Sequence, residues 1–230
     1  FLDKFKKLFK KKIYEMLKKL KLEDVKIYIG KDCKRRNIWR KKFFKDYKEH
    51  RKIKDGDNVG RIFKYVYNEK LFEECEIVDI LYHENLEADD CIALSTKYIL
   101  DNNNDANIYI ITSDMDYLQL AEERVKLYNL KYKLLTDSRN CYNNPKKDLL
   151  FKIITGDKSD GILPVFNRCG KKLFEKYYEG RYNGSNKLEE DLNKDFKYKE
   201  RYELNKKLID FDNIPDVLKN IFIKKYKNIL

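Results

Sequence analysis

Short apolar segments that end in acidic turns alternate with segments of helical periodicity through the first half of this chain. Candidate strands cover residues 25–29, 77–81, 107–112 and 124–128, and residues 86–100 have apolar side chains at helical spacing. Strands separated by helices form a parallel sheet with helices on both sides, and functional side chains gather at the carboxyl ends of such strands. We therefore expect an α/β fold with a mostly parallel central sheet and a site at this edge.

Carboxylates are concentrated at that edge. Between residues 79 and 120 there are nine Asp and Glu against one lysine, although the whole chain has a net charge of +12. Crowded carboxylates raise one another's pKa unless a cation lies among them, and hard oxygen ligands suit Mg²⁺ or Mn²⁺. Acids in a first helical turn also serve capping and the helix dipole, which accounts for one or two of these residues but not for a second pair after the next strand. The candidate ligands are Glu87, Asp89, Asp90, Asp114 and Asp116.

Composition restricts the class of protein. With 42% hydrophobic and 14% aromatic residues the 230-residue chain can bury a core, and a pI near 9.2 favours a polyanionic partner, either nucleic acid or an anionic membrane. Five scattered cysteines without a C-x-x-C pair and only two histidines argue against a disulfide framework and a zinc site. With neither a signal peptide nor an apolar run of about 18 residues, we expect a soluble intracellular protein.

The first 20 residues have apolar side chains at helical spacing and lysines on the other faces. Such a helix can lie on a membrane, but we favour a core-facing helix with a solvated lysine face because acidic and strand segments follow directly. An open α/β fold normally begins with a strand, so we expect this sequence to start after it.

Residues 31–54 are strongly basic and carry interleaved aromatic side chains. Lysines and arginines bind phosphates, and aromatic faces stack on unpaired bases, so we favour nucleic-acid contact over a merely solvated surface. A turn at residues 55–58 then precedes a helix over 59–72. The aromatic residues are Trp39, Phe43, Phe44 and Tyr47.

Helical segments replace the strands beyond Pro145. A helix over 149–154 leads into a turn that carries Asp157 and Asp160, a weak signal alone because Asp is common in turns. Gly170, Lys171 and Lys172 open another helix, whose backbone amides could hold a phosphate. We expect a loop or loose helix over 181–195 and closing helices over 198–209 and 217–226.

Four motifs in this order resemble those of the 5′ nuclease superfamily, which comprises flap endonucleases, phage 5′-to-3′ exonucleases and the 5′ nuclease domain of bacterial DNA polymerase I. The resemblance extends along the chain from about residue 25 to 212, and the polymerase-associated and phage branches look closest. The motifs are Tyr47-Lys48-Glu49-His50-Arg51, Glu87-Ala88-Asp89-Asp90, Thr112-Ser113-Asp114-Met115-Asp116-Tyr117-Leu118-Gln119-Leu120 and Gly156-Asp157-Lys158-Ser159-Asp160.

The resemblance implies a PIN-like fold with a helical arch at about 31–72 in a nuclease core (1–148), followed by a helix-three-turn-helix DNA-binding lobe (149–230). It implies hydrolysis of DNA phosphodiesters at 5′ ends or flaps by two Mg²⁺ or Mn²⁺ ions, with K⁺ in the helix-three-turn-helix. The implied metal ligands are Asp32, Glu87, Asp89, Asp90, Asp114, Asp116, Asp157 and Asp160. The implied catalytic residues are Lys48 and Arg51, two cations that grip the scissile phosphate, and the implied nucleic-acid contacts are Arg40, Lys48, Arg51, Gly170, Lys171 and Lys172.

Three features depart from the family pattern. No first strand with its Asp precedes Phe1, and Asp32 follows the strand end at Gly30 later than the family's Asp does. Of the family's glycine-rich hairpin turn, only Gly170 remains, which puts the K⁺ site in question more than the phosphate contact.

The function expected from this resemblance is a monomeric nuclease of DNA replication or repair. It would act on 5′ ends, flaps and single-strand/duplex junctions, wherever DNA is replicated, with a sliding clamp or a polymerase as a further partner and no membrane. Two alternatives stay open: a nucleic-acid-binding scaffold that has lost cleavage, and an RNA-cleaving relative, because backbone contacts do not distinguish the sugar.

Overall fold

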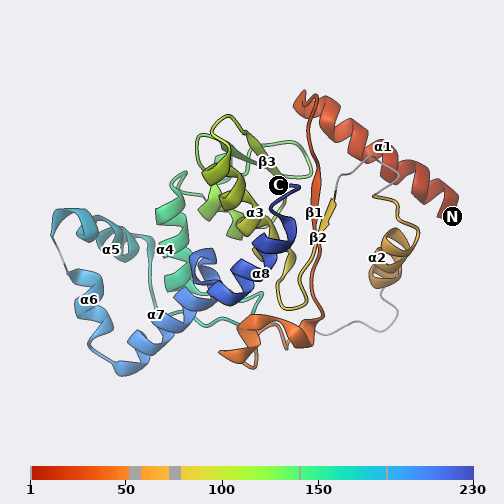
Figure 1. The fold of residues 1–230 in the computed structure, drawn as a ribbon. Coiled ribbons are helices and arrows are strands. Elements are labelled where there is room, and N and C mark those ends of the chain that lie inside the picture. Colours follow the sequence, from red (N-terminus) through yellow and green to blue (C-terminus); the bar gives the residue numbers. More distant parts are fainter. Residues whose placement is uncertain (1, 52–57, 73–78, 140, 185) are drawn as a thin grey trace.

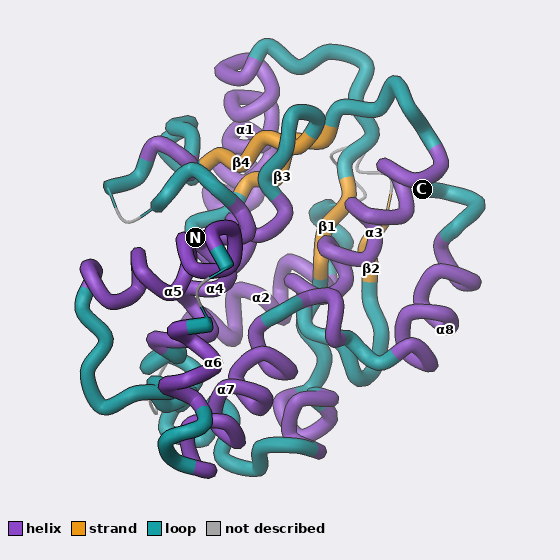
Figure 2. Tube along the Cα trace, turned by 90° about the vertical axis from the view of Figure 1, so that its left-hand side faces the viewer, coloured by secondary structure: helices purple, strands orange, loops and turns teal. Residues whose placement is uncertain are grey.

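Two pairs of parallel strands form the centre of the molecule. The structure is a computed structural model, and it describes residues 2–51, 58–72, 79–139, 141–184 and 186–230. β1 (Tyr28–Gly30) pairs with β2 (Asp79–Leu81), and β3 (Ile108–Ile111) pairs with β4 (Val125–Tyr128). The parallel α/β architecture is confirmed. Within the described residues, however, the strands form two separate two-stranded sheets rather than one continuous sheet (Figure 2).

Helices make up most of the remaining described chain, and their positions agree with the periodicity to within a few residues. The α-helices are α1 (Leu2–Leu20), α2 (Asn58–Asn68), α3 (Ala88–Asn102), α4 (Pro145–Thr155), α5 (Lys171–Asn183), α6 (Lys187–Leu192), α7 (Phe196–Ile209) and α8 (Asp216–Tyr226). Short 3-10 helices are η1 (Arg35–Asn37), η2 (Trp39–Lys42), η4 (Met115–Leu120), η5 (Leu135–Asp137) and η6 (Phe211–Asn213). The segment expected to be a loop or loose helix at 181–195 contains the end of α5 and all of α6.

The main core lies around α3, which packs against β1 and β2 and against α8 (Figure 1). Fully buried Leu81, Leu127 and Phe222 belong to this core. The Tyr226 hydroxyl at the end of α8 accepts a hydrogen bond from the Tyr82 backbone N–H (2.9 Å). The C-terminal helix therefore fixes the end of β2, directly before the acidic α3 segment.

A second, aromatic core holds α4, α5, α6 and α7 together on one side of the molecule (Figure 1). Phe174 packs edge-on against Phe151, with ring centroids 5.0 Å apart, and Tyr177 donates a hydrogen bond to the buried Asp191 carboxylate (2.8 Å). This helical group carries the turn that contains Asp157 and Asp160.

The amphipathic helix α1 lies with α2 on the opposite side of the molecule (Figure 1). Phe5 contacts Tyr65 of α2, and Phe9 contacts Phe72 just beyond it. These contacts favour the core-facing interpretation of α1 over a membrane-bound one. In the part of the chain that the structure describes, no helix has both the length and the apolar character of a membrane span.

The basic segment is partly described. Residues 31–51 form η1, η2 and a series of turns, whereas the turn expected at 55–58 falls almost wholly outside the described residues. The helical arch at about 31–72 thus stays a prediction. Of the four aromatic residues expected to stack on bases, Trp39 and Tyr47 are wrong for that role because both are buried, whereas Phe43 is 44% exposed.

Candidate active site

A close helix–strand approach positions the N-terminus of α3 at the end of β1. A Cβ on Gly30 would lie only 2.7 Å from the Ala88 carbonyl oxygen, so glycine permits this contact. Asp32, two residues further along, is exposed, and its Oδ1 accepts a hydrogen bond from the Ala88 backbone N–H (2.9 Å). The structure therefore places Asp32 at the start of α3 as a helix-capping group, beside the other acids but already engaged.

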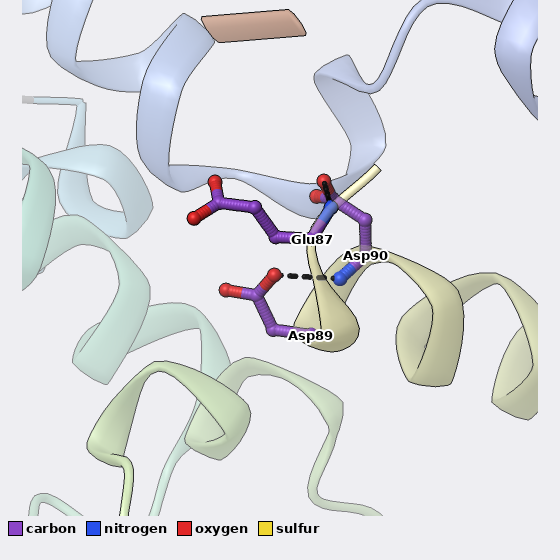
Figure 3. Close-up of side chains that lie close together, drawn as sticks. All are labelled: Glu87, Asp89 and Asp90. Atoms are coloured by element: carbon purple, nitrogen blue, oxygen red, sulfur yellow. Dashed lines mark hydrogen bonds between the residues drawn. The ribbon is translucent and has the colours of Figure 1, made fainter. Parts of the chain in front are cut away.

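The first acidic cluster consists of Glu87, Asp89 and Asp90, and one carboxylate oxygen from each lies within 4.8 Å of the others. Glu87 is the N-cap of α3, and its backbone N–H donates to Asp90 Oδ2 (3.0 Å). Figure 3 shows the carboxylates of Glu87 and Asp89 on the same side, with Asp90 turned back toward the Glu87 backbone. Glu87 and Asp89 are therefore the members of the cluster that face a common space.

Burial, and next the charge of Asp90, raise the pKa of Asp89 well above its ordinary value, although the Arg40 guanidinium opposes the shift. A raised carboxyl pKa means that the ionised form has too little positive charge around it. Hard oxygen donors with uncompensated negative charge suit a divalent cation, so these residues fit a Mg²⁺ or Mn²⁺ ion.

Arg40 is an interior residue and not a surface contact. Its side chain is 2% exposed, and its guanidinium donates to Asp90 (2.8 and 2.9 Å), Glu87 (2.8 Å) and the Leu208 carbonyl (2.7 Å). The Trp39 indole N–H also donates to Asp90 (2.9 Å). This position does not support the predicted contact of Arg40 with nucleic acid, because no donor edge of the guanidinium faces solvent. The Asp90 carboxylate thus accepts hydrogen bonds from Arg40, from Trp39 and from the Glu87 backbone N–H. It holds these groups in place at the start of α3.

The second acidic cluster consists of Asp116, Asp157 and Asp160, again with one oxygen from each within 4.8 Å of the others. Asp116 lies in η4 after β3, and the other two lie in the turn that follows α4. Asp114 is exposed and caps η4, its Oδ1 accepting from the Asp116 N–H (3.0 Å), so it lies next to this cluster without belonging to it. A tight turn closed by mutual backbone bonds of Asp157 and Ile162 (2.8 and 2.9 Å) brings the two later carboxylates to η4.

The two members of the cluster that contact Lys152 have opposite pKa shifts. Burial raises the pKa of Asp116 to about 6, and Lys152 opposes that shift. Burial also acts to raise the pKa of Asp157, but hydrogen bonds from Lys152 and Ser159 outweigh it and lower the pKa.

Tyr47 and Lys48 join the two clusters. The Tyr47 hydroxyl lies 3.1 Å from Glu87 Oε2 and 2.9 Å from Asp160 Oδ2, and Lys48 Nζ lies 2.6 Å from Glu87 Oε1 and 3.6 Å from Asp160 Oδ2. Arg51 pairs with Asp160 and donates to the Ser159 carbonyl oxygen (2.8 Å). The clusters are therefore adjacent, and both predicted catalytic cations, Lys48 and Arg51, lie at their junction.

Comparison with known proteins decides the family. The sequence model described as "5′-3′ exonuclease, N-terminal resolvase-like domain" matches residues 6–147. The chain belongs to this family. The resemblance to the 5′ nuclease superfamily is thus confirmed, and a search of curated protein sequences finds no significant match.

Solved structures of this nuclease group share the fold. The T5 D15 protein co-crystallised with metal ions superimposes with a TM-score of 0.70 at 19% identity, covering 100% of this chain and 94% of that chain. A complex of the bacteriophage T5 D15 flap endonuclease with DNA and metal ions gives 0.69 at 19% identity, covering 98% and 90%. T5 5′-exonuclease with bound zinc gives 0.64 at 18% identity, covering 98% and 91%.

The second acidic cluster contains a lysine that the sequence analysis missed. Lys152 of α4 pairs with Asp116 (2.5 Å) and with Asp157 (2.6 Å). Nothing in the sequence distinguishes it from a lysine on a solvated helix face. Outside both clusters, Gly170 is the N-cap of α5 and is exposed, as are Lys171 and Lys172, so these three predicted contacts are accessible at a helix N-terminus.

Proposed function

We propose that this chain is a divalent-metal-dependent nuclease that hydrolyses DNA phosphodiesters at 5′ ends or 5′ flaps. The observation that carries the proposal is the adjacency of two acidic clusters, joined by Tyr47 and Lys48, in a chain of the 5′-3′ exonuclease family. A protein that only binds DNA gains nothing from carboxylates next to phosphate, whereas a metal-dependent nuclease needs them. DNA is further supported by the similarity in fold to a flap endonuclease solved with DNA.

The ligands we propose come from both clusters. In the first, Glu87 and Asp89 present oxygens to a common space, with Asp90 and Asp32 acting behind them. In the second, Asp116, Asp157 and Asp160 provide the oxygens, with Asp114 adjacent. Bound Mg²⁺ or Mn²⁺ would supply an activated water and electrostatic stabilisation of the attacking and leaving oxygens.

The basic residues at the junction hold the substrate phosphate. Lys48 and Arg51 are paired with Glu87 and Asp160 in this structure, and burial acts to lower the pKa of Lys48 while Glu87 and Asp160 outweigh it and raise that pKa. Lys48 therefore stays an ammonium. When metals neutralise the acids, both cations can turn to the scissile phosphate and stabilise its developing charge.

A second contact holds the duplex backbone. Residues 156–170 connect α4 to α5, and the backbone amides at the start of α5, together with the side chains of Lys171 and Lys172, suit a phosphate. We assign this connection to the helix-three-turn-helix of a lobe spanning 149–230, with K⁺ as its further ion and residues 1–148 as the nuclease core. We further propose that the protein acts as a monomer in DNA replication or repair, and that a sliding clamp or a polymerase is its protein partner.

Cleavage of a DNA duplex with a labelled 5′ flap tests this function. We expect short 5′ products with Mg²⁺ and none with EDTA. Asp89→Asn should abolish cleavage and leave DNA binding equal or tighter, because it removes a ligand and one charge that repels phosphate. The matched control is Asp105→Asn, the same change at an exposed carboxylate outside both clusters, which should cut at the parent rate.

The outcomes separate the alternatives. Cutting by Asp89→Asn at the parent rate would refute the metal assignment. Faster cleavage of an RNA flap than of the DNA flap would favour an RNA-cleaving relative. Tight DNA binding without any cutting in Mg²⁺ or Mn²⁺ would favour a binding scaffold.

A further inference from the structure

Lys152 lies inside the second acidic cluster. Its ammonium is 2.5 Å from Asp116 Oδ1 and 2.6 Å from Asp157 Oδ2, so it bridges two carboxylates that come from separate elements, η4 and the turn after α4. Its side chain is 27% exposed, which leaves it a path toward solvent.

A divalent cation and this ammonium would need the same space. Magnesium coordinates carboxylate oxygens at about 2.0–2.1 Å, and the ammonium already lies at hydrogen-bond distance from two of the three oxygens that could coordinate it. Two cations within a few ångströms of each other repel strongly at a partly buried site. A metal ion can therefore enter the second cluster only when Lys152 moves out.

The first cluster lacks such an internal competitor at Asp89. Arg40 pairs with Asp90 and Glu87, and Lys48 pairs with Glu87, but within the described residues no lysine or arginine lies within ion-pair distance of the Asp89 carboxylate. In the second cluster, by contrast, all three carboxylates are paired, two with Lys152 and Asp160 with Arg51. Asp89 is thus open to a cation in a way that Asp116 and Asp157 are not.

The displaced ammonium has an alternative partner nearby. Asp148 lies one helical turn before Lys152 on α4, and a small pocket is lined by both of them together with Asp116. Its carboxylate accepts hydrogen bonds from the backbone N–H groups of Tyr142 (2.8 Å) and Asn144 (3.3 Å), which leave its negative charge uncompensated. Movement of the Lys152 side chain within this pocket would release the acidic cluster without any change of the backbone.

We propose that Lys152 is a tethered cation that occupies the second acidic cluster until a divalent metal displaces it, so that the two clusters bind metal with unequal affinity. This inference rests on the proposed metal-dependent function and adds an order of loading to it, first cluster before second. Lys152 is a positioning residue in this account, because it acts through the ligands and not on the substrate.

Mn²⁺ titration of the whole chain without DNA, with free Mn²⁺ measured by electron paramagnetic resonance, tests the proposal. We expect the parent chain to bind one Mn²⁺ tightly and a second weakly. Lys152→Met should tighten the second site by about tenfold or more and leave the first unchanged, because the competing charge is gone. Lys152→Arg, which keeps a cation, should leave the second site weak.

A matched control removes the same charge from the same helix. Lys147 pairs with Glu175, away from both clusters, so Lys147→Met should bind Mn²⁺ as the parent does. Adding Asp157→Asn to Lys152→Met should abolish the gain and thereby assign it to the second cluster. Circular dichroism verifies folding, and Lys152→Gln replaces Lys152→Met if the latter fails to fold.

Unchanged or weaker second-site affinity in folded Lys152→Met would overturn the inference while leaving the nuclease proposal intact, because the first site and flap cleavage are measured separately. Absence of Mn²⁺ binding in every variant would overturn both.

Discussion

Arg40→Met removes a cation that is fully buried in the site. The guanidinium makes three hydrogen bonds to Asp90 and Glu87 and one to the Leu208 carbonyl, and Asp90 itself is 0% exposed. Methionine fills a similar volume but leaves the carboxylates without their cation. Loss of one partner of a buried ion pair destabilises a protein by about 3–5 kcal/mol.

We expect the free energy of unfolding to fall by an amount near the lower end of that range, because both carboxylates keep other partners. Asp90 keeps the bonds from the Trp39 indole (2.9 Å) and the Glu87 backbone (3.0 Å), and Glu87 keeps Lys48 (2.6 Å). For a chain of this size, about 3 kcal/mol lowers the thermal midpoint by roughly 6–12 °C. Urea unfolding at pH 7 measures the free-energy difference directly.

The control for this substitution is Arg124→Met. Arg124 donates to the carbonyl oxygens of Asn103 (2.9 Å) and Leu100 (3.2 Å), so its loss strands no carboxylate and should cost about 1 kcal/mol. If Arg40→Met lowers the free energy of unfolding by less than about 1 kcal/mol, Arg40 does not stabilise the fold by neutralising Asp90 and Glu87. A tenfold loss of DNA affinity by folded Arg40→Met would instead restore the predicted nucleic-acid contact.

Three further predictions follow from particular contacts. Gly30→Ala should destabilise the protein by about 1–3 kcal/mol in urea unfolding, because its Cβ would lie 2.7 Å from the Ala88 carbonyl, whereas Gly170→Ala, with nothing within 4 Å, should be near neutral. Burial acts to raise the pKa of Asp191, but hydrogen bonds from lysines and a tyrosine outweigh it and lower the pKa to about 2. The ionised form therefore stabilises the fold above the ordinary pKa near 3.8, and the stability difference between the parent and Asp191→Asn, about 1 kcal/mol after allowance for solvent screening, should vanish as pH falls from about 4 through 2. Lys48→Ala should slow single-turnover flap cleavage by about a hundredfold or more, and an unchanged rate would exclude it from charge stabilisation.

Periodicity predicted the longer elements because apolar side chains recur in them at the spacing of a helix or strand. The helix over 86–100 and the strand over 107–112 appear as α3 and β3 with boundaries shifted by at most two residues. Sheet continuity was not predictable, since strand patterns specify which face is buried but not which strands are neighbours. The structure has two separate strand pairs in its described residues.

The spacing of the acids predicted which side chains lie close together better than the pattern of surrounding bases did. The acids that cluster lie at strand ends, helix starts and a tight turn, positions that local sequence specifies. Trp39 and Tyr47 were misread because an aromatic residue between lysines has the same pattern whether it stacks on a base or is buried against Glu87 and Asp90. The position of Lys152 in the second cluster could not be predicted from the sequence, because only the folded chain brings its helix to η4.

The cations of the site differ in how readily they can leave. Side-chain exposure rises from 2% for Arg40 through 15% for Lys48 to 27% for Lys152. Arginine's fixed fork holds the Asp90 carboxylate with two donors, whereas each lysine offers a single ammonium on a flexible stem. Without bound metal, the clustered carboxylates need cationic side chains beside them for the protein to fold. Cations that could not move away would, however, exclude the metal. A buried arginine for the anchoring carboxylate and half-buried lysines for the ligands satisfy both requirements. Substitution of Arg40 should therefore act on stability, and substitution of Lys48 or Lys152 on the binding of metal and phosphate.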